Sequence, residues 1–142
     1  MLKLSPADIF LDCRASSKAQ ALQIAAEALE QAGYVKGGFL NALLNREKSV
    51  STYLGAGIAL PHCARESIDL VVSTGVQLFQ FPQGVSWGGG KVAFVVVAVA
   101  AQQDEHLETI AAIADLLGDE AKTTLLADAR TKDEFIQRFE QP

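Results

Sequence analysis

The chain has 142 residues, of which 49% are hydrophobic and 20% are charged, and this composition is typical of one globular domain covering residues 1–142. Its net charge of −5 argues against a protein that binds nucleic acid or an anionic membrane surface, since such proteins normally carry a basic face. No signal peptide is visible, the two cysteines form no Cys-x-x-Cys pair, and the longest apolar run, residues 92–101, is about half of a membrane span. We therefore expect a cytoplasmic protein that reaches a membrane only through a partner.

Helices are predicted in most of the first third of the chain. Residues 5–8, Ser-Pro-Ala-Asp, are typical of a capped helix start, and they lead into a short strand over 9–13. Apolar residues at helical spacing predict an amphipathic helix over 16–32 and a second helix over 38–48.

The middle third reads as strands. Residues 52–60, 70–81 and 91–100 are rich in β-branched and aromatic side chains, and Pro82 and Gly84 are expected to separate the second strand from the third. The third segment is apolar at successive positions, which predicts a central strand covered on both faces.

The last third is predicted to be helical. Asp104 is expected to cap a helix that runs through Leu117 and stops at Gly118, and two shorter helices are expected over 121–129 and 131–139. Helices before, between and after the strands predict an α/β fold with a sheet sandwiched by α-helices.

His62 is the first candidate for chemistry. It follows Pro61 at the end of a predicted strand, near the glycine-rich turn of residues 55–57. Proline restricts the chain before the histidine, and glycines nearby would let a ligand approach closely. Strand-to-loop junctions are common places for sites on α/β sheets. The alternative is a structural histidine at a strand end.

His106 and Arg46 are the other two candidates. His106 is expected in the first turn of a helix, where the positive end of the dipole favours anions and a neutral imidazole. The guanidinium of Arg46 matches the geometry of a phosphate. A neutral imidazole is a nucleophile towards phosphorus, so the three residues together would make a phosphoryl-transfer site. The alternatives are a surface histidine and a solvated arginine paired with Glu47 or another carboxylate.

Other chemistries fit the sequence less well. A zinc hydrolase would need His62, His106 and Cys63 as ligands. Cys63 directly follows His62, and adjacent strand residues point to opposite faces, so Cys63 is expected to be a small buried residue. Neither a Walker A motif nor a complete Rossmann fingerprint occurs, and no cofactor is predicted.

The order of these motifs is familiar. Residues 7–25, 43–63, 74–87 and 95–117 resemble the mannitol/fructose-type (type 2) enzyme IIA domains of the bacterial phosphoenolpyruvate-dependent sugar phosphotransferase system, and the last of them is most similar to the mannitol branch. The resemblance implies a mixed β-sheet flanked by helices in a single domain.

The resemblance also implies a function and roles for the candidates. His62 would be the phosphorylated histidine, and His106 and Arg46 would stabilise the phosphoryl group. The donor would be the phosphocarrier HPr and the acceptor a cysteine of an enzyme IIB, with sugar uptake through a membrane enzyme IIC. A regulatory protein of the nitrogen branch, phosphorylated on His62 to control its binding to a target, is the alternative. Cys63 stands where many family members have glycine.

Overall fold

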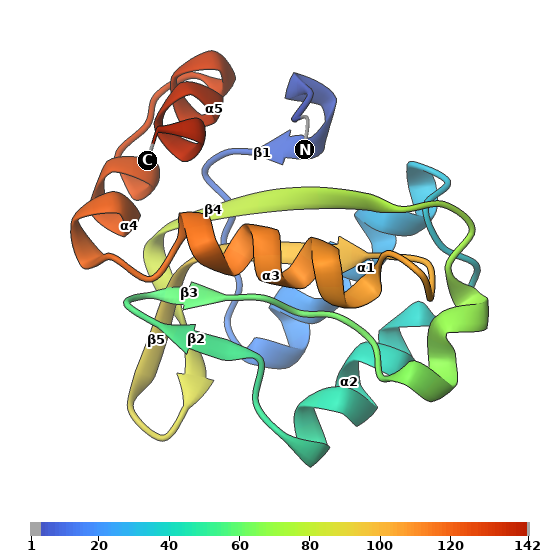
Figure 1. Ribbon diagram of the computed structural model, residues 1–142. Coiled ribbons are helices and arrows are strands. Elements are labelled where there is room, and N and C mark those ends of the chain that lie inside the picture. Colours follow the sequence, from blue (N-terminus) through green and yellow to red (C-terminus); the bar gives the residue numbers. More distant parts are fainter. Residues whose placement is uncertain (1–3, 142) are drawn as a thin grey trace.

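The computed structural model describes residues 4–141, and its centre is a mixed five-stranded sheet (Figure 1). The strand order is β1-β4-β5-β3-β2. Strand β1 is parallel to β4, and β3 is parallel to β5. The β4–β5 and β2–β3 pairs are antiparallel. The strands are β1 (Ile9–Phe10), β2 (Tyr53–Gly55), β3 (Ile58–Ala59), β4 (Gly75–Gly88) and β5 (Lys91–Ala100).

Helices cover both faces of this sheet. The first face carries α1 (Lys18–Gln31) and α2 (Phe39–Ser49). The second face carries α3 (His106–Leu116), α4 (Glu120–Ala127) and α5 (Lys132–Glu140). The predicted α/β fold with a sheet sandwiched by helices is confirmed. Two 3-10 segments complete the described chain, η1 (Pro6–Asp8) and η2 (Arg65–Leu70).

The central strand β5 separates two apolar cores, as its sequence predicts. Alternate side chains point to opposite faces of a strand, so each face of β5 contributes to a different core. Val96, Ala98 and Ala100 pack against α1 and α2. Val95, Val97 and Val99 pack on the side of the three C-terminal helices. Burial of each valine stabilises the fold by about 1.5–3 kcal/mol.

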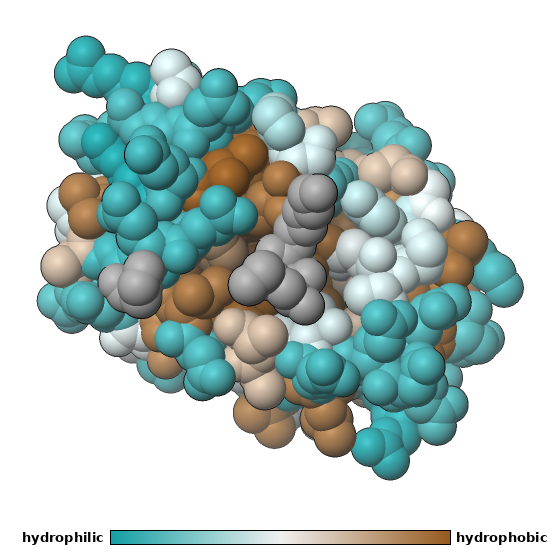
Figure 2. All heavy atoms as spheres, turned by 45° about the horizontal axis from the view of Figure 1, so that its top comes forward, coloured by the Kyte–Doolittle hydropathy of each residue, from teal (hydrophilic) through white to brown (hydrophobic). Residues whose placement is uncertain are grey.

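The outer helices are amphipathic. Viewed from the side of α5 and β1, polar residues cover much of the surface and apolar side chains are visible between them (Figure 2). This is the surface expected of helices that lay an apolar stripe on a sheet. Among residues 4–141, no helix has both the length and the apolar content that crossing a bilayer requires.

Strand β4 differs from the sequence prediction. It begins at Gly75 and continues through Pro82 and Gly84, so the expected separation of two strands at these residues is wrong. The register between β4 and β5 shifts between Gln80 and Val85, which marks a bulge. A bulge leaves residues unpaired, so the missing N–H of Pro82 does not interrupt the ladder.

The segment predicted as one strand over 52–60 is a hairpin of β2 and β3. Its turn places Gly55, Ala56 and Gly57 at φ values of 102°, 54° and 80°. A Cβ on Gly57 would lie 3.0 Å from Thr123 Cγ2 of α4, so this glycine allows close packing as well as the turn.

The predicted helices are present, with bounds that differ by at most two residues for α1, α2, α4 and α5. The predicted cap of α3 is wrong, because the N-cap is Glu105 rather than Asp104 and no side chain caps this end. The Glu105 carboxylate instead accepts a hydrogen bond from Thr74 Oγ1, at 2.8 Å. The first-turn N–H groups of α3 therefore have no acceptor from this side chain.

Candidate functional site

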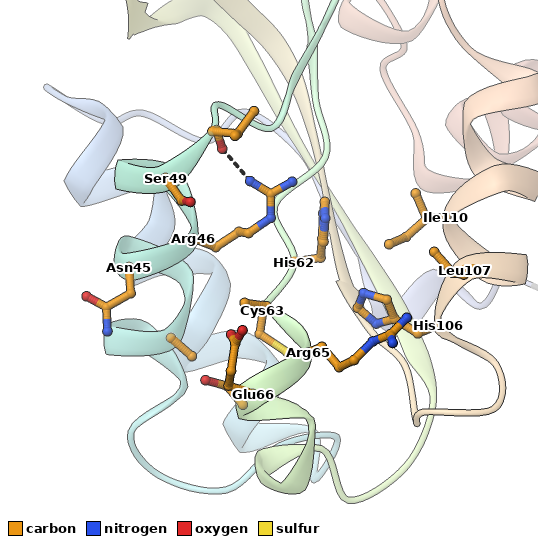
Figure 3. A pocket seen from close by; sticks show the side chains of 14 residues that line it. Asn45, Arg46, Ser49, His62, Cys63, Arg65, Glu66, His106, Leu107 and Ile110 are labelled. Carbon is orange, nitrogen blue, oxygen red and sulfur yellow. Dashed lines mark hydrogen bonds between the residues drawn. The ribbon is translucent and has the colours of Figure 1, made fainter.

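The three candidate residues line one pocket of about 760 Å³ (Figure 3). Arg46 comes from the last turn of α2, His62 from the segment after β3, and His106 from the first position of α3. The ring centroids of the two histidines are 5.7 Å apart. Because β3 and β5 are parallel neighbours, the segments that follow them leave the sheet at the same edge, and this brings the histidines together.

The backbone around His62 is fixed by the sheet. The N–H of Leu60 donates to the carbonyl of Thr52, and the N–H of Val99 donates to the carbonyl of Pro61, both at 2.9 Å. The His62 ring then bonds through Nδ1 to the Leu60 carbonyl at 2.7 Å. A carbonyl can only accept, so Nδ1 carries the proton and the lone pair of the neutral ring is on Nε2.

The environment keeps the His62 ring neutral. Burial is the main cause that lowers its pKa below the ordinary value of 6.5, and the charges of Arg46 and His106 lower it further. The Leu60 carbonyl and Glu47 act in the opposite direction without reversing the shift. At pH 7 the ring is therefore in the form that can attack phosphorus.

His106 lies at the positive end of α3, as the sequence predicts. Burial lowers its pKa below 6.5, and the guanidinium groups of Arg65 and Arg46 add to this effect. The carbonyl of Ala101 favours the protonated ring, although Nδ1 is buried and reaches no partner at hydrogen-bond geometry within residues 4–141. Because Nδ1 makes no hydrogen bond in the described part of the chain, the Ala101 carbonyl does not hold a proton on the ring. His106 is therefore a neutral ring with an unbonded nitrogen rather than a solvated surface side chain.

Arg46 pairs with neither Glu47 nor any other carboxylate within residues 4–141, so that alternative is wrong. Its Nη1 donates to the carbonyl of Val50, which fixes the guanidinium at the pocket wall (Figure 3). The Glu47 carboxylate instead accepts from the N–H of Thr52 at 3.2 Å and pairs with Lys18 at 3.4 Å. The remaining donors of Arg46 are available to an anion in the pocket.

Cys63 is a buried residue, as predicted. Its side chain is 2% exposed and belongs to the core under α1 and α2. Within the described part of the chain, no three His, Cys, Asp or Glu side chains come close enough together to bind a metal ion. The zinc hydrolase alternative therefore lacks a ligand set in this pocket.

Sequence reasoning misplaced one feature and missed another. The glycine-rich turn of residues 55–57 packs near α4 and does not line the pocket, so the expectation that it frames His62 is wrong. Arg65 does line the pocket, at the start of η2, and its side chain extends towards His106 (Figure 3). An arginine three positions after His62 was the only available signal.

Comparison with known proteins gives consistent matches over nearly the whole chain. The family model described as "Phosphoenolpyruvate-dependent sugar phosphotransferase system, EIIA 2" matches residues 3–141. The chain is 45% identical over 135 residues to a multiphosphoryl transfer protein of Haemophilus influenzae, covering 95% of this chain and 27% of that protein. It is 37% identical over 139 residues to the mannitol-specific EIICBA component of Escherichia coli, covering 96% and 22%. The chain thus spans under a third of either relative.

A solved structure agrees with the sequence matches. The complex of mannitol enzyme IIA and phosphorylated enzyme IIB from Escherichia coli contains a chain that is 36% identical to this one. The two chains superimpose with a TM-score of 0.91, covering 98% of each. The fold and the family are therefore established by the same comparison.

Proposed function

The chain belongs to the type 2 enzyme IIA family of the phosphoenolpyruvate-dependent sugar phosphotransferase system, a family of phosphotransferases, and we propose that His62 accepts a phosphoryl group from phospho-HPr and passes it to a cysteine of an enzyme IIB. The observation that carries this proposal is the meeting of His62, His106 and Arg46 in one pocket, with Nδ1 of His62 bonded to the backbone.

In the accepting step, the lone pair of His62 Nε2 attacks the phosphorus of the donor phosphohistidine. The new N–P bond forms as the donor N–P bond breaks, and the donor ring nitrogen keeps the electron pair of the broken bond. The bond from Nδ1 to the Leu60 carbonyl holds the ring in the reactive tautomer and stabilises the positive charge that develops on it.

The pocket supplies positive charge for the transferred group. Arg46 is held in place by the Val50 carbonyl, so its guanidinium does not have to reorganise when the phosphoryl group arrives. The first-turn N–H groups of α3 and Nε2 of His106, the ring nitrogen that is not buried, are further donors at the same place.

In the donating step, a cysteine thiolate of enzyme IIB attacks the phosphorus, an S–P bond forms, and His62 Nε2 regains its lone pair. Support comes from the solved relative, which is a complex of an enzyme IIA with a phosphorylated enzyme IIB. We place the chain on the cytoplasmic side of a mannitol-type or fructose-like uptake system, in which a membrane enzyme IIC carries the sugar.

The test is reconstitution in vitro. The protein is mixed with phosphoenolpyruvate, enzyme I and HPr, and the intact mass is followed for a gain of one phosphoryl group. His62→Gln is expected to gain none, while His106→Gln, the matched control, still gains one at a reduced rate. The absence of a gain by the wild-type protein would overturn the proposal.

A second stage separates transport from regulation. Purified phosphoprotein is mixed with mannitol-type and fructose-type enzyme IIB, and loss of its phosphoryl group is measured. Transfer to a IIB cysteine supports the transport role. A stable phosphoprotein that transfers to neither would support the regulatory alternative, in which phosphorylation of His62 controls binding to a target.

A further inference from the structure

Arg65 has no assigned partner although it lies in the pocket. Within residues 4–141, the ion pairs are Lys18–Glu47 and Arg138–Glu134, so no carboxylate is within 4.0 Å of the Arg65 guanidinium. Even Glu66, the next residue and a lining residue itself, does not pair with it. The charge of Arg65 is thus available to a ligand of the pocket.

The position of Arg65 complements that of Arg46. Arg46 reaches the pocket from the end of α2, and Arg65 reaches it from the start of η2, with its side chain extended towards His106 (Figure 3). Burial is the main cause that lowers the pKa of His106. Of the two arginines, Arg65 lowers this pKa more than Arg46 does. The two guanidinium groups therefore approach the histidines from separate elements.

A phosphoryl group brings more charge than Arg46 alone neutralises. It carries between one and two negative charges at pH 7 and three acceptor oxygens. One Nη of Arg46 is already bonded to the Val50 carbonyl. We propose that Arg65 is a second phosphoryl-binding arginine, which donates hydrogen bonds to the oxygens of the group carried on His62. This inference rests on the proposed function and adds a residue to it.

The exposure of Arg65 determines how large its effect is. Arg65 is solvent-exposed and unanchored, so binding the phosphoryl group orders a flexible side chain and part of the gain is lost as entropy. We expect a smaller contribution from Arg65 than from the anchored Arg46.

The experiment uses phosphoramidate, a small donor without a protein surface, so that phosphoryl binding is separated from docking. As the His62 Nε2–P bond forms, the P–N bond to ammonia breaks and ammonia leaves with the electron pair. Arg65→Gln is expected to slow the phosphorylation of the full chain by about fivefold to tenfold. Arg65→Lys should recover part of the rate. Arg14→Gln, at another exposed arginine that makes no ion pair in the described part of the chain, should leave it unchanged.

A second readout is the titration of His106 by NMR in the unphosphorylated chain. The charges that face its ring are Arg65 on η2 and Arg46 on α2, and the ring of His62 lies beside it. Removing the positive charge of Arg65 should raise the pKa of His106, and Arg65→Lys should restore it. An unchanged pKa would place the guanidinium away from the site and overturn the inference.

The outcomes are distinct from those of the proposed function. Equal rates for wild type and Arg65→Gln with phosphoramidate would overturn the role of Arg65 and leave that of His62 intact. Slower reaction with phospho-HPr but not with phosphoramidate would also overturn it, because Arg65 would then contact the partner protein. A wild-type chain that is phosphorylated by neither donor would overturn both proposals.

Discussion

The two walls of the pocket are built differently. The first, which we call the anchored wall, carries Arg46 and His62, and each of these side chains is bonded to the backbone of the β2–β3 region or its approach. Glu47 lies behind this wall and bonds to the backbone of Thr52. The second, the free wall, carries Arg65 and His106. Neither of these side chains makes a side-chain hydrogen bond within residues 4–141.

The difference matches two demands of the proposed phosphoryl transfer. The nucleophile must be held in one tautomer and one direction, and the anchored wall does this before any phosphoryl group arrives. The group must also leave again, and side chains without fixed partners can close on it and release it at small cost. Both walls would be damaged by substitution, but we expect the anchored wall to be the more sensitive.

After His62→Gln, which should abolish phosphorylation, the largest expected effect is that of Arg46→Gln on the anchored wall. Loss of a pre-organised guanidinium should slow phosphorylation of His62 by about a hundredfold, as for other fixed donors to a developing anion. The rate is measured by intact mass with phospho-HPr. Arg46→Lys keeps the positive charge but lacks the planar, two-pronged donor geometry of a guanidinium. Its phosphorylation rate should lie between those of the wild type and Arg46→Gln. A loss no greater than that of Arg65→Gln would remove the distinction between the walls.

His106→Gln tests the free wall. This change removes an imidazole that lines the pocket, and it should slow phosphorylation by about tenfold, less than Arg46→Gln. The same intact-mass assay measures it, and circular dichroism checks that α3 is retained. Complete loss of phosphorylation in a folded variant would show that His106 is as essential as His62.

Glu47→Gln tests the support of the anchored wall. The change weakens the bonds to Thr52 and the ion pair with Lys18, and we expect the free energy of unfolding to fall by about 1 kcal/mol. Urea denaturation measures this, with Glu27→Gln on the exposed surface of α1 as the control. Unchanged stability would mean that the wall is held by its backbone bonds alone.

The smallest expected effect is on the pH dependence. An ordinary histidine is about three quarters protonated at pH 6. Burial lowers the pKa of His62, so its ring should remain more neutral than that, and phosphorylation should fall only at lower pH. NMR titration of the ring gives the pKa directly. A value at or above 6.5 would contradict the burial that the structure shows.

The same shift has a consequence for stability with a fixed sign. The unfolded chain binds protons at His62 and His106 below about pH 6.5, whereas the folded chain binds them only at lower pH. The stabilisation from the neutral rings is therefore present above pH 6.5 and is lost as the pH falls towards the folded pKa values. In the His62→Gln variant, the slope of stability against pH in this window should be shallower.

Much of the fold could be predicted from the sequence. The apolar run of β5 predicted a strand with two buried faces because no exposed strand has that composition. The sequence also pointed to three candidate site residues, His62, His106 and Arg46, because their chemistry and motifs are distinctive. Sequence alone did not show that they meet, since this depends on β3 and β5 being parallel neighbours.

The features that the sequence did not predict depend on packing between residues that are far apart along the chain. The need for a glycine at position 57 arises from close packing against Thr123 of α4, which is far away in the sequence. The continuation of β4 past Pro82 depends on the register of β5. Arg65 was not identified as a candidate because nothing local in the sequence indicates that the chain after Pro61 turns into η2 beside the start of α3.

The placement of the pocket across both helical layers has a mechanical consequence. Arg46 stands on the layer that covers one face of the sheet, and His106 stands on the layer that covers the other. The distance between these residues is therefore set by the thickness of the sheet between the layers, and a close-packed interior does not adjust that thickness freely. An enlarged side chain near the C-terminal end of β5, such as Ala98→Leu, would change the width of the pocket without altering any residue that lines it.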